Sequence, residues 1–88
     1  MIEMSYKISY PHGLHARPAT LLVAKVSSFQ SQVFLTYKGS SVNMKSIMGV
    51  LSLGVPENQS FKIMVDGVDE QECMLAIQRL IADINQSS

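Results

Sequence analysis

The spacing of apolar residues constrains the fold of this 88-residue chain more than any other feature of its sequence. Apolar and polar residues alternate from Ile2 to Tyr10, and a period of two is typical of a strand with one buried face. After a break at residues 11–13, apolar residues recur at helical spacing from Ala16 to about Phe29. A half-buried strand followed by a one-sided helix predicts a domain in which helices cover one face of a sheet.

The same change of period occurs again along the rest of the chain. Alternating segments predict strands at residues 32–37, 41–44 and 60–65, with a turn at 38–40. Ser46 is a good N-cap and Gly54 a good C-terminal stop, so a short helix is predicted between them. Asp69 and Glu72 have the spacing of a capping box before a last helix, which we expect to end in a frayed polar tail at residues 85–88. The last helix carries one apolar stripe: Cys73, Met74, Ile77, Leu80, Ile81 and Ile84.

The predicted order is therefore βαββαβα, an α+β fold with one sheet face open to solvent. Short connections favour antiparallel pairing of the second and third strands, but the patterns leave the order of strands in the sheet open. The length and an apolar content of 47% suit a single globular domain, residues 1–88.

Composition narrows the classes of function. Seven basic and seven acidic residues give a formal charge of zero, which disfavours a general nucleic-acid surface. Cys73 is the only cysteine, which excludes an internal disulfide and suits a reducing cytosol. The sequence has no signal-peptide pattern and no apolar run of the ~20 residues that a membrane helix needs. We expect a cytoplasmic protein that is not inserted in a membrane.

Residues 13–19, Gly-Leu-His-Ala-Arg-Pro-Ala, place a histidine where the first predicted strand gives way to the first helix. The first N–H groups of a helix have no intrahelical partners, and the helix dipole makes this end an anion site. Neutral imidazole is a nucleophile near pH 7, and Arg17 adds a forked donor suited to phosphate. We interpret His15 as the acceptor of a phosphoryl group, with Arg17 assisting the transfer. Ala16, Arg17 and His12 are predicted to line the phosphate site.

Two other interpretations of these residues are weaker. His12 and His15 could supply two ligands to a metal ion, but a zinc site needs three or four, and no further cluster of ligands lies nearby in the sequence. We expect neither a metal nor another cofactor. A small RNA- or ligand-binding α+β domain is disfavoured because Phe34, on the open sheet face, has no basic stretch beside it.

A second helix start, at Ser46, has a different character. A phosphate added to this serine would be tolerated by the helix dipole but would disturb the apolar residues that follow it. Residues 47–53 are apolar on nearly every side, so some of them must be exposed, and a cluster of exposed apolar groups marks an interaction site. With Thr20 and Leu21 close to His15, the sequence predicts an apolar ring around the histidine.

The stretch 13–19 and residues 45–54, Lys-Ser-Ile-Met-Gly-Val-Leu-Ser-Leu-Gly, resemble the HPr family, the histidine-containing phosphocarriers of the bacterial sugar phosphotransferase system. The resemblance covers almost the whole chain, and the second motif is similar to the form found in Bacillus-type Gram-positive bacteria. It implies an open-faced sandwich of four antiparallel strands in the order 1-4-2-3, with three helices on one face.

The resemblance also implies partners and roles. Enzyme I, with phosphoenolpyruvate as the ultimate donor, would phosphorylate His15 at Nδ1, and His15 would pass the group to sugar-specific enzyme IIA domains. HPr kinase/phosphorylase would modify Ser46, and the phosphoserine form would bind a LacI-type catabolite repressor as its corepressor. Such a carrier forms a phosphohistidine intermediate but is not a stand-alone turnover enzyme. The implied docking surface consists of Thr20, Leu21, Ala24, Ile47, Met48 and Leu51.

Three departures from the family pattern stand out. His12 occupies a position where the family often has a small polar residue. Ala24 and Ser27 stand where some members carry lysines, which weakens electrostatic steering toward acidic partners. Residues 31–35 are similar to Crh, a paralogue that acts only in catabolite repression and lacks the active histidine. The presence of His15 favours a phosphocarrier, and a Crh-like corepressor acting mainly through phosphorylated Ser46 is the alternative.

Overall fold

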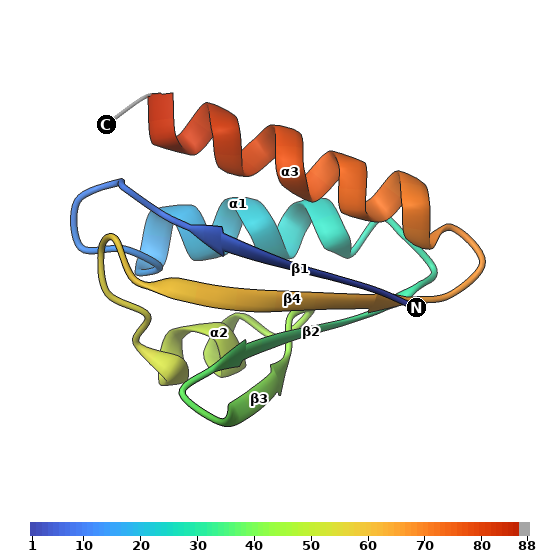
Figure 1. The fold of residues 1–88 in the computed structure, drawn as a ribbon, viewed down its shortest axis with the longest axis horizontal. Helices are drawn as coiled ribbons and strands as arrows, with labels where there is room; N and C mark the ends of the chain where they lie inside the picture. The colour runs from blue at the N-terminus through green and yellow to red at the C-terminus, as the bar shows by residue number, and fades with distance from the viewer. Residues whose placement is uncertain (87–88) are drawn as a thin grey trace.

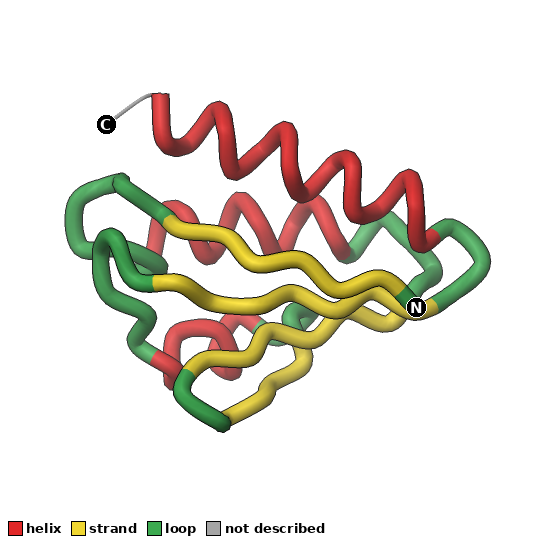
Figure 2. Tube along the Cα trace, in the orientation of Figure 1, coloured by secondary structure: helices red, strands yellow, loops and turns green. Residues whose placement is uncertain are grey.

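The computed structural model describes residues 1–86. In this part of the chain the elements follow one another in the order β1 (Ile2–Lys7), α1 (Ala16–Val26), β2 (Gln32–Tyr37), β3 (Ser40–Asn43), α2 (Ile47–Leu53), β4 (Ser60–Asp66) and α3 (Glu70–Gln86). Figures 1 and 2 show the strands as one twisted sheet, with α1 and α3 running next to each other along it. The predicted βαββαβα order is confirmed.

All four strands form one antiparallel sheet in the order β1-β4-β2-β3. The register pairs Leu35 with Ile63 and Phe34 with Met64. Because directly opposed residues of an antiparallel pair point to the same face, Leu35 and Ile63 share the buried face, whereas Phe34 and Met64 are half-buried on the other one. The strand order 1-4-2-3 and the open-faced sandwich implied by the resemblance are confirmed.

The helices bury their apolar stripes against this sheet. On α1, Ala19, Leu22 and Val26 have no exposed surface, and burying one such leucine contributes roughly 1.5–3 kcal/mol. The predicted stripe of α3 is buried as well, with Leu80 at its border. Together with the inward residues of the strands, these side chains make one core: Ile8, Leu14, Ala19, Leu22, Val26, Val33, Leu35, Met44, Val50, Val55, Phe61, Ile63, Val65, Cys73, Met74, Ile77, Ile81 and Ile84.

Strand β1 ends at Lys7, three residues earlier than the alternation predicts. Its ladder with β4 stops at the pair Lys7 and Ser60. Beyond it, the side chain of Asn85 accepts from the N–H of Ser9 at 2.8 Å and donates to the carbonyl of Lys7 at 3.0 Å. Helix α3 extends to Gln86, so the expected frayed tail is wrong for residues 85–86. Residues 87–88 lie outside the described part of the chain.

Helix α1 ends at Val26 rather than near Phe29. The hydroxyls of Ser27 and Ser28 donate to the carbonyls of Val23 and Lys25, so these side chains compete with the helical hydrogen bonds. The N–H of Phe29 bonds to Val26 in a tighter three-residue turn, which closes the helix. The third strand is also displaced by one residue, to Ser40–Asn43.

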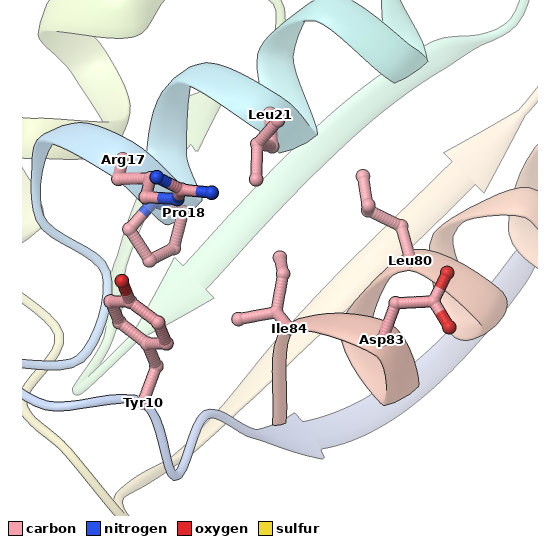
Figure 3. A pocket seen from close by; sticks show the side chains of 7 residues that line it. All are labelled: Tyr10, Arg17, Pro18, Leu21, Leu80, Asp83 and Ile84. Carbon is pink, nitrogen blue, oxygen red and sulfur yellow. The ribbon is translucent and has the colours of Figure 1, made fainter. Parts of the chain in front are cut away.

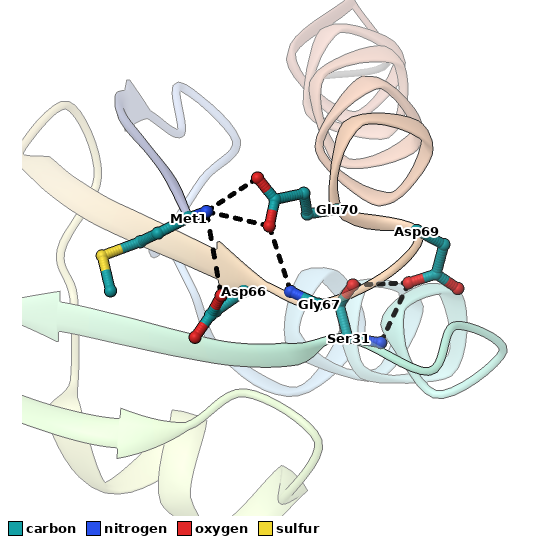
Figure 4. A network of polar contacts seen from close by, with 6 residues as sticks. All are labelled: Met1, Ser31, Asp66, Gly67, Asp69 and Glu70. Atoms are coloured by element: carbon teal, nitrogen blue, oxygen red, sulfur yellow. Dashed lines mark hydrogen bonds and ion pairs between the residues drawn. The ribbon is translucent and has the colours of Figure 1, made fainter.

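Polar contacts with neighbouring segments hold the start of α3 (Figure 4). The Asp69 carboxylate accepts from the N–H groups of Gln30 and Ser31 and from the Ser31 hydroxyl, and these bonds, the hydroxyl's first, lower the pKa of Asp69. The carboxylate of Glu70, and not that of Glu72, accepts from a backbone N–H, that of Gly67, at 3.1 Å. Glu70 also accepts from the amino group of Met1. The predicted capping box between Asp69 and Glu72 is therefore wrong.

Candidate functional site

The turn before α1 sets the position of His15. The N–H of Gly13 donates to the carbonyl of Tyr10 at 2.9 Å, which closes a four-residue turn over Pro11 and His12. His12 has a φ of 68°, so the turn combines a leading proline with a left-handed third residue, as type II turns do. Left-handed backbone is uncommon for residues other than Gly, and His is one of the few side-chain types that adopt it more often, so His12 fits this position of the turn.

Gly13 makes a close approach that no side chain permits. Its φ is 65°, and a Cβ added there would lie 2.5 Å from the carbonyl carbon of Pro56, 2.6 Å from the nitrogen of Glu57, and closer still to the carbonyl oxygen of Val55. That same oxygen accepts from the N–H of Leu14 at 2.9 Å. The segment 55–57 therefore fixes the entry into α1.

His15 is the N-cap of α1, as predicted, but its side chain makes no capping hydrogen bond. The first intrahelical bond runs from the N–H of Ala19 to the carbonyl of His15 at 3.0 Å. The N–H groups of Ala16 and Arg17 have no partner among residues 1–86, and Pro18 has no N–H to donate. The first turn of α1 also carries no acidic residue. Two free N–H groups thus stand next to the histidine, as an anion site requires.

Two rings flank the half-buried His15. The centroid of the Tyr10 ring lies 6.3 Å from that of His15, inclined by 33°. The centroid of the exposed His12 ring lies 5.5 Å away, and the two imidazoles are nearly perpendicular, at 82°. The structure therefore brings His12 next to His15, as the sequence analysis expects for a residue lining the site.

Arg17 borders a pocket of 200 Å³ between the start of α1 and the end of α3 (Figure 3). In Figure 3 the Tyr10 hydroxyl points toward Pro18, and the Asp83 carboxylate lies on the other side of the pocket from Arg17. His15 does not line this pocket, which adjoins the histidine through Tyr10 and Arg17. The full lining is Tyr10, Arg17, Pro18, Leu21, Leu80, Asp83 and Ile84.

Ser46 is the N-cap of α2, and its exposed hydroxyl accepts from the N–H of Gly49 at 3.2 Å. Gly54 ends the helix in the left-handed conformation, with its N–H bonded to the carbonyl of Leu51. Both predicted ends of the short helix are confirmed. No comparable side-chain bond closes the start of α1.

The predicted docking residues differ in exposure. Leu21 is 41% exposed and Met48 72%, and Thr20 and Ala24 are exposed as well. The Thr20 hydroxyl donates to the carbonyl of Ala16 at 2.6 Å. On α2, Ile47 and Leu51 are half-buried against the core. Exposed apolar side chains are therefore present on both α1 and α2.

Helix α3 adds to this surface. Leu21 and Ala24 border a shallow groove of 420 Å³ together with Lys25, Ser28 and Leu80. Leu80 also lines the pocket that holds Arg17, so both hollows meet at this α3 residue. The groove gives the α1 face a second apolar border, on the side of α3.

The described residues, 1–86, contain no group of three or more His, Cys, Asp or Glu side chains that could hold a metal ion. None of the helices found there has the length and apolar character needed to cross a membrane. Burial raises the pKa of the Cys73 thiol, which lies in the core.

A family model described as the PTS HPr component phosphorylation site matches residues 2–83 of the chain. The chain belongs to the HPr family. HPr-C-His from Thermoanaerobacter tengcongensis is 40% identical over 100% of this chain and 99% of its own, with a TM-score of 0.94. HPr from Bacillus anthracis is 33% identical over 90% and 94%, with a TM-score of 0.84. Crh from Bacillus subtilis is 36% identical over 94% and 95%, with a TM-score of 0.74.

The resemblance to the HPr family is thus confirmed, and the chain is an HPr-family phosphocarrier. Proteins of this family interact with enzymes of the phosphotransferase system. The solved relatives include both HPr and Crh.

Sequence reasoning missed two residues that lie beside the candidate site. The alternation assigns Tyr10 to the buried face of a strand, but the strand ends at Lys7 and Tyr10 instead flanks His15. Leu80 was expected only in the core, although its place at the border of the α3 stripe is the signal for a partly exposed side chain. Leu80 reaches the site from a distant segment of the chain, whereas Tyr10 reaches His15, five residues later, through the turn that the N–H of Gly13 closes on Tyr10.

Proposed function

We propose that this HPr-family protein accepts a phosphoryl group on His15 from enzyme I and passes it to enzyme IIA domains of the sugar phosphotransferase system. One observation carries the proposal: His15 is an uncapped N-cap, and the free N–H groups of Ala16 and Arg17 stand beside it. Such a helix start binds an anion without rearrangement, and so it supports both the empty and the loaded histidine.

The transfer step is a displacement at phosphorus. A lone pair on a ring nitrogen of neutral His15 attacks the phosphorus atom, and a P–N bond forms as the bond from phosphorus to the donor atom breaks. The electron pair of the broken bond stays with the donor. Charge spreads over the three equatorial oxygens, where the N–H groups of Ala16 and Arg17 and the Arg17 guanidinium would stabilise it. His12 would line the same phosphate.

Partners would dock on the face that surrounds His15. The exposed side chains of Leu21 and Met48 support this role, because apolar groups exposed near one site favour protein contacts. The proposed docking residues are Thr20, Leu21, Ala24, Ile47, Met48 and Leu51. The groove that Leu80 borders would extend this face toward α3.

Ser46 is the proposed regulatory site. HPr kinase/phosphorylase would phosphorylate its exposed hydroxyl in the cytoplasm, and the modified protein would bind a LacI-type catabolite repressor. A phosphate there would stand close to Met48 and add about −2 charge to an apolar docking face, which favours one set of partners over another.

A Crh-like corepressor, acting mainly through phosphorylated Ser46, is the second candidate. The observation that favours it is the similarity to Crh at 36% identity over 94% of the chain. The two functions make different demands: the corepressor needs only Ser46, whereas the carrier needs His15.

The deciding experiment is incubation of the purified protein with enzyme I and phosphoenolpyruvate. We expect acid-labile phosphate on wild type and on Ser46→Ala, and none on His15→Ala. Ser46→Ala is the matched control because it removes the other phosphorylatable helix start. Absence of acid-labile phosphate on wild type, or its persistence on His15→Ala, would refute the carrier function.

The regulatory role is tested with HPr kinase/phosphorylase, ATP and a purified LacI-type repressor. We expect acid-stable phosphate on wild type and His15→Ala but not on Ser46→Ala, and repressor binding only by the phosphorylated protein. Equal repressor affinity with and without the phosphate would rule out the corepressor role.

A further inference from the structure

His12 stands at the left-handed position of the turn before α1, where Gly or Asn would also fit. Its exposed ring has its centroid 5.5 Å from that of His15. No hydrogen bond or ion pair to another residue of the described chain, 1–86, holds the ring in place. The imidazole is therefore close to the phosphoacceptor, solvated, and able to gain or lose a proton without breaking a contact of the fold.

The charge next to His12 changes when His15 is phosphorylated. A phosphoryl group adds about −1.5 to −2 charge at pH 7. An opposite charge within ~4–6 Å favours the charged form of a titratable group, and histidine is the side chain that ordinarily titrates between about pH 5 and 8. Loading His15 therefore favours the imidazolium form of His12.

We propose that His12 is a proton-dependent counter-charge for the phosphoryl group, an inference that rests on the proposed phosphorylation of His15. It takes up a proton when the group arrives and releases the proton when the group leaves. His12 thereby couples the phosphoryl-transfer equilibrium of this protein to pH.

The direction follows from linkage, which is reciprocal between the proton and the phosphoryl group. If phosphate favours a charged His12, a charged His12 favours phosphate, so acid stabilises the loaded state. At a pH low enough for the His12 ring to be charged in both the free and the loaded protein, the stabilisation of the loaded state is complete. At a pH high enough for the ring to be neutral in both the free and the loaded protein, this stabilisation is absent.

The size of the effect follows from distance and screening. The phosphorus atom would stand one P–N bond beyond the His15 ring, whose centroid lies 5.5 Å from that of His12. The two charges would then lie within roughly one Debye length, about 8 Å at physiological salt, so their attraction is weakened but not abolished. In a solvated setting this gives a shift of the loading equilibrium by about threefold to tenfold.

Other charged or titratable groups share this corner of the molecule. They are the Tyr10 hydroxyl and the His15 ring beside it, Arg17 on α1, Asp83 across the pocket on α3, and Glu57 in the segment packed on Gly13. A substitution at position 12 leaves all of them in place. The difference between wild type and a His12 variant at each pH therefore gives the effect of His12, including its effect on the neighbouring His15 ring.

Two variants make the test sharp. His12→Asn keeps a polar residue that tolerates left-handed backbone and removes the proton site. His12→Lys supplies a positive charge that persists at every pH of the test. A lysine can adopt the left-handed backbone of this position, because Lys38 already does so in this chain, with a φ of 49°. The loading equilibrium with enzyme I, phosphoenolpyruvate and pyruvate is measured from about pH 6 to pH 8.5, the range that spans histidine titration.

We expect the equilibrium constant of wild type to exceed that of His12→Asn by about threefold to tenfold near pH 6 and to match it near pH 8.5. His12→Lys should exceed His12→Asn at every pH. Parallel pH profiles for wild type and His12→Asn would overturn the proposal, as would phosphate located on His12 itself.

A second measurement does not depend on enzyme I. The protein is phosphorylated with phosphoramidate, and the His12 ring is titrated by NMR before and after loading. We expect its titration midpoint to rise by about half to one pH unit on loading, with no change in a His15→Ala sample treated identically. An unchanged midpoint would overturn the proposal. Failure with enzyme I but a raised midpoint after chemical loading would refute the carrier function and leave the counter-charge standing.

Discussion

The starts of α1 and α2 are built in opposite ways. At α2 the N-cap side chain, Ser46, accepts a hydrogen bond from the N–H of Gly49. At α1 the N-cap side chain, His15, makes no such bond, and the N–H groups of Ala16 and Arg17 have no partner among residues 1–86. One helix start is closed by its own side chain, whereas the other keeps its donors free for a ligand.

The difference separates what stabilises a helix from what makes it reactive. A serine cap stabilises a helix by ~1 kcal/mol, so α1 forgoes that contribution at its start. Contacts elsewhere replace it: Gly13 and Leu14 are fixed against the 55–57 segment, and Pro18 and Ala19 are buried in the first turn. The loop and the core, rather than a cap, hold His15 in position.

The largest effect is expected when the loop contact that replaces the cap is broken. Gly13→Ala forces a Cβ into the backbone of residues 55–57 at a positive φ, and should lower the free energy of unfolding by more than about 3 kcal/mol. Gly39→Ala is the matched control, because its φ is 82° but nothing lies within 4 Å of the added Cβ, and it should cost about 1 kcal/mol. Urea denaturation measures both, and equal losses would contradict the close approach.

The next effect tests the closed start directly. Ser46→Ala removes the cap of α2 and should lower the free energy of unfolding by about 1 kcal/mol. Ser52→Ala removes another exposed hydroxyl of the same helix, one that only donates to the carbonyl of Gly49, and should change stability little. Equal urea midpoints for the two variants would show that Ser46 does not act as a cap.

The open start can be closed by substitution. His15→Ser gives α1 the capping side chain that it lacks, and should raise the free energy of unfolding by about 0.5–1 kcal/mol. His15→Ala should stay within about 0.5 kcal/mol of wild type, because it removes no capping bond. Chemical denaturation of the three proteins side by side checks the order; a destabilised His15→Ser would mean that the histidine supports the fold in a way its contacts do not reveal.

The last test extends the comparison to α3, whose start is held by other segments. The Ser31 hydroxyl and nearby N–H groups lower the pKa of Asp69, so its folded pKa lies below the unfolded value of ~3.9. Its contribution to stability is present above that value and is lost as the pH falls toward the folded pKa. Ser31→Ala should therefore lose less stability than wild type between about pH 7 and pH 3. Urea midpoints at both pH values test this, with Ser28→Ala as a hydroxyl control.

Local patterns were sufficient for the elements and for both helix starts. Period two and period 3.6 identify the strands and helices because each element buries one face on a common core. His15, Ser46 and Gly54 could be placed from sequence because a cap or a stop depends on a few consecutive residues. The strand order came from the family resemblance, since the alternation does not say which strands are neighbours.

Long-range contacts account for what the sequence did not predict. Asn85 binds the backbone at Lys7 and Ser9, so the end of β1 depends on the far end of the chain. The same holds at the site for Leu80, which brings α3 to the border of the groove beside α1. The spacing of residues along a chain predicts whether a segment is a helix or a strand. Contacts between segments that are far apart in the sequence can be seen only in the folded structure.

The N–H of Leu14 donates to the carbonyl of Val55, so we expect the loop that carries His15 to become ordered only after Val55 has been synthesised. During synthesis, a nascent chain that has emerged only as far as α2 contains every residue that would bind phosphate, yet it lacks the carbonyl that orders the loop. The loop can contact Val55 only when the 55–58 segment is present and β4 has joined the sheet. In the same segment, the N–H of Asn58 donates to the carbonyl of Ile8. We therefore expect the site to be completed only after residues 55–58 and β4 have been synthesised, and an N-terminal fragment that ends before Val55 should transfer no phosphate.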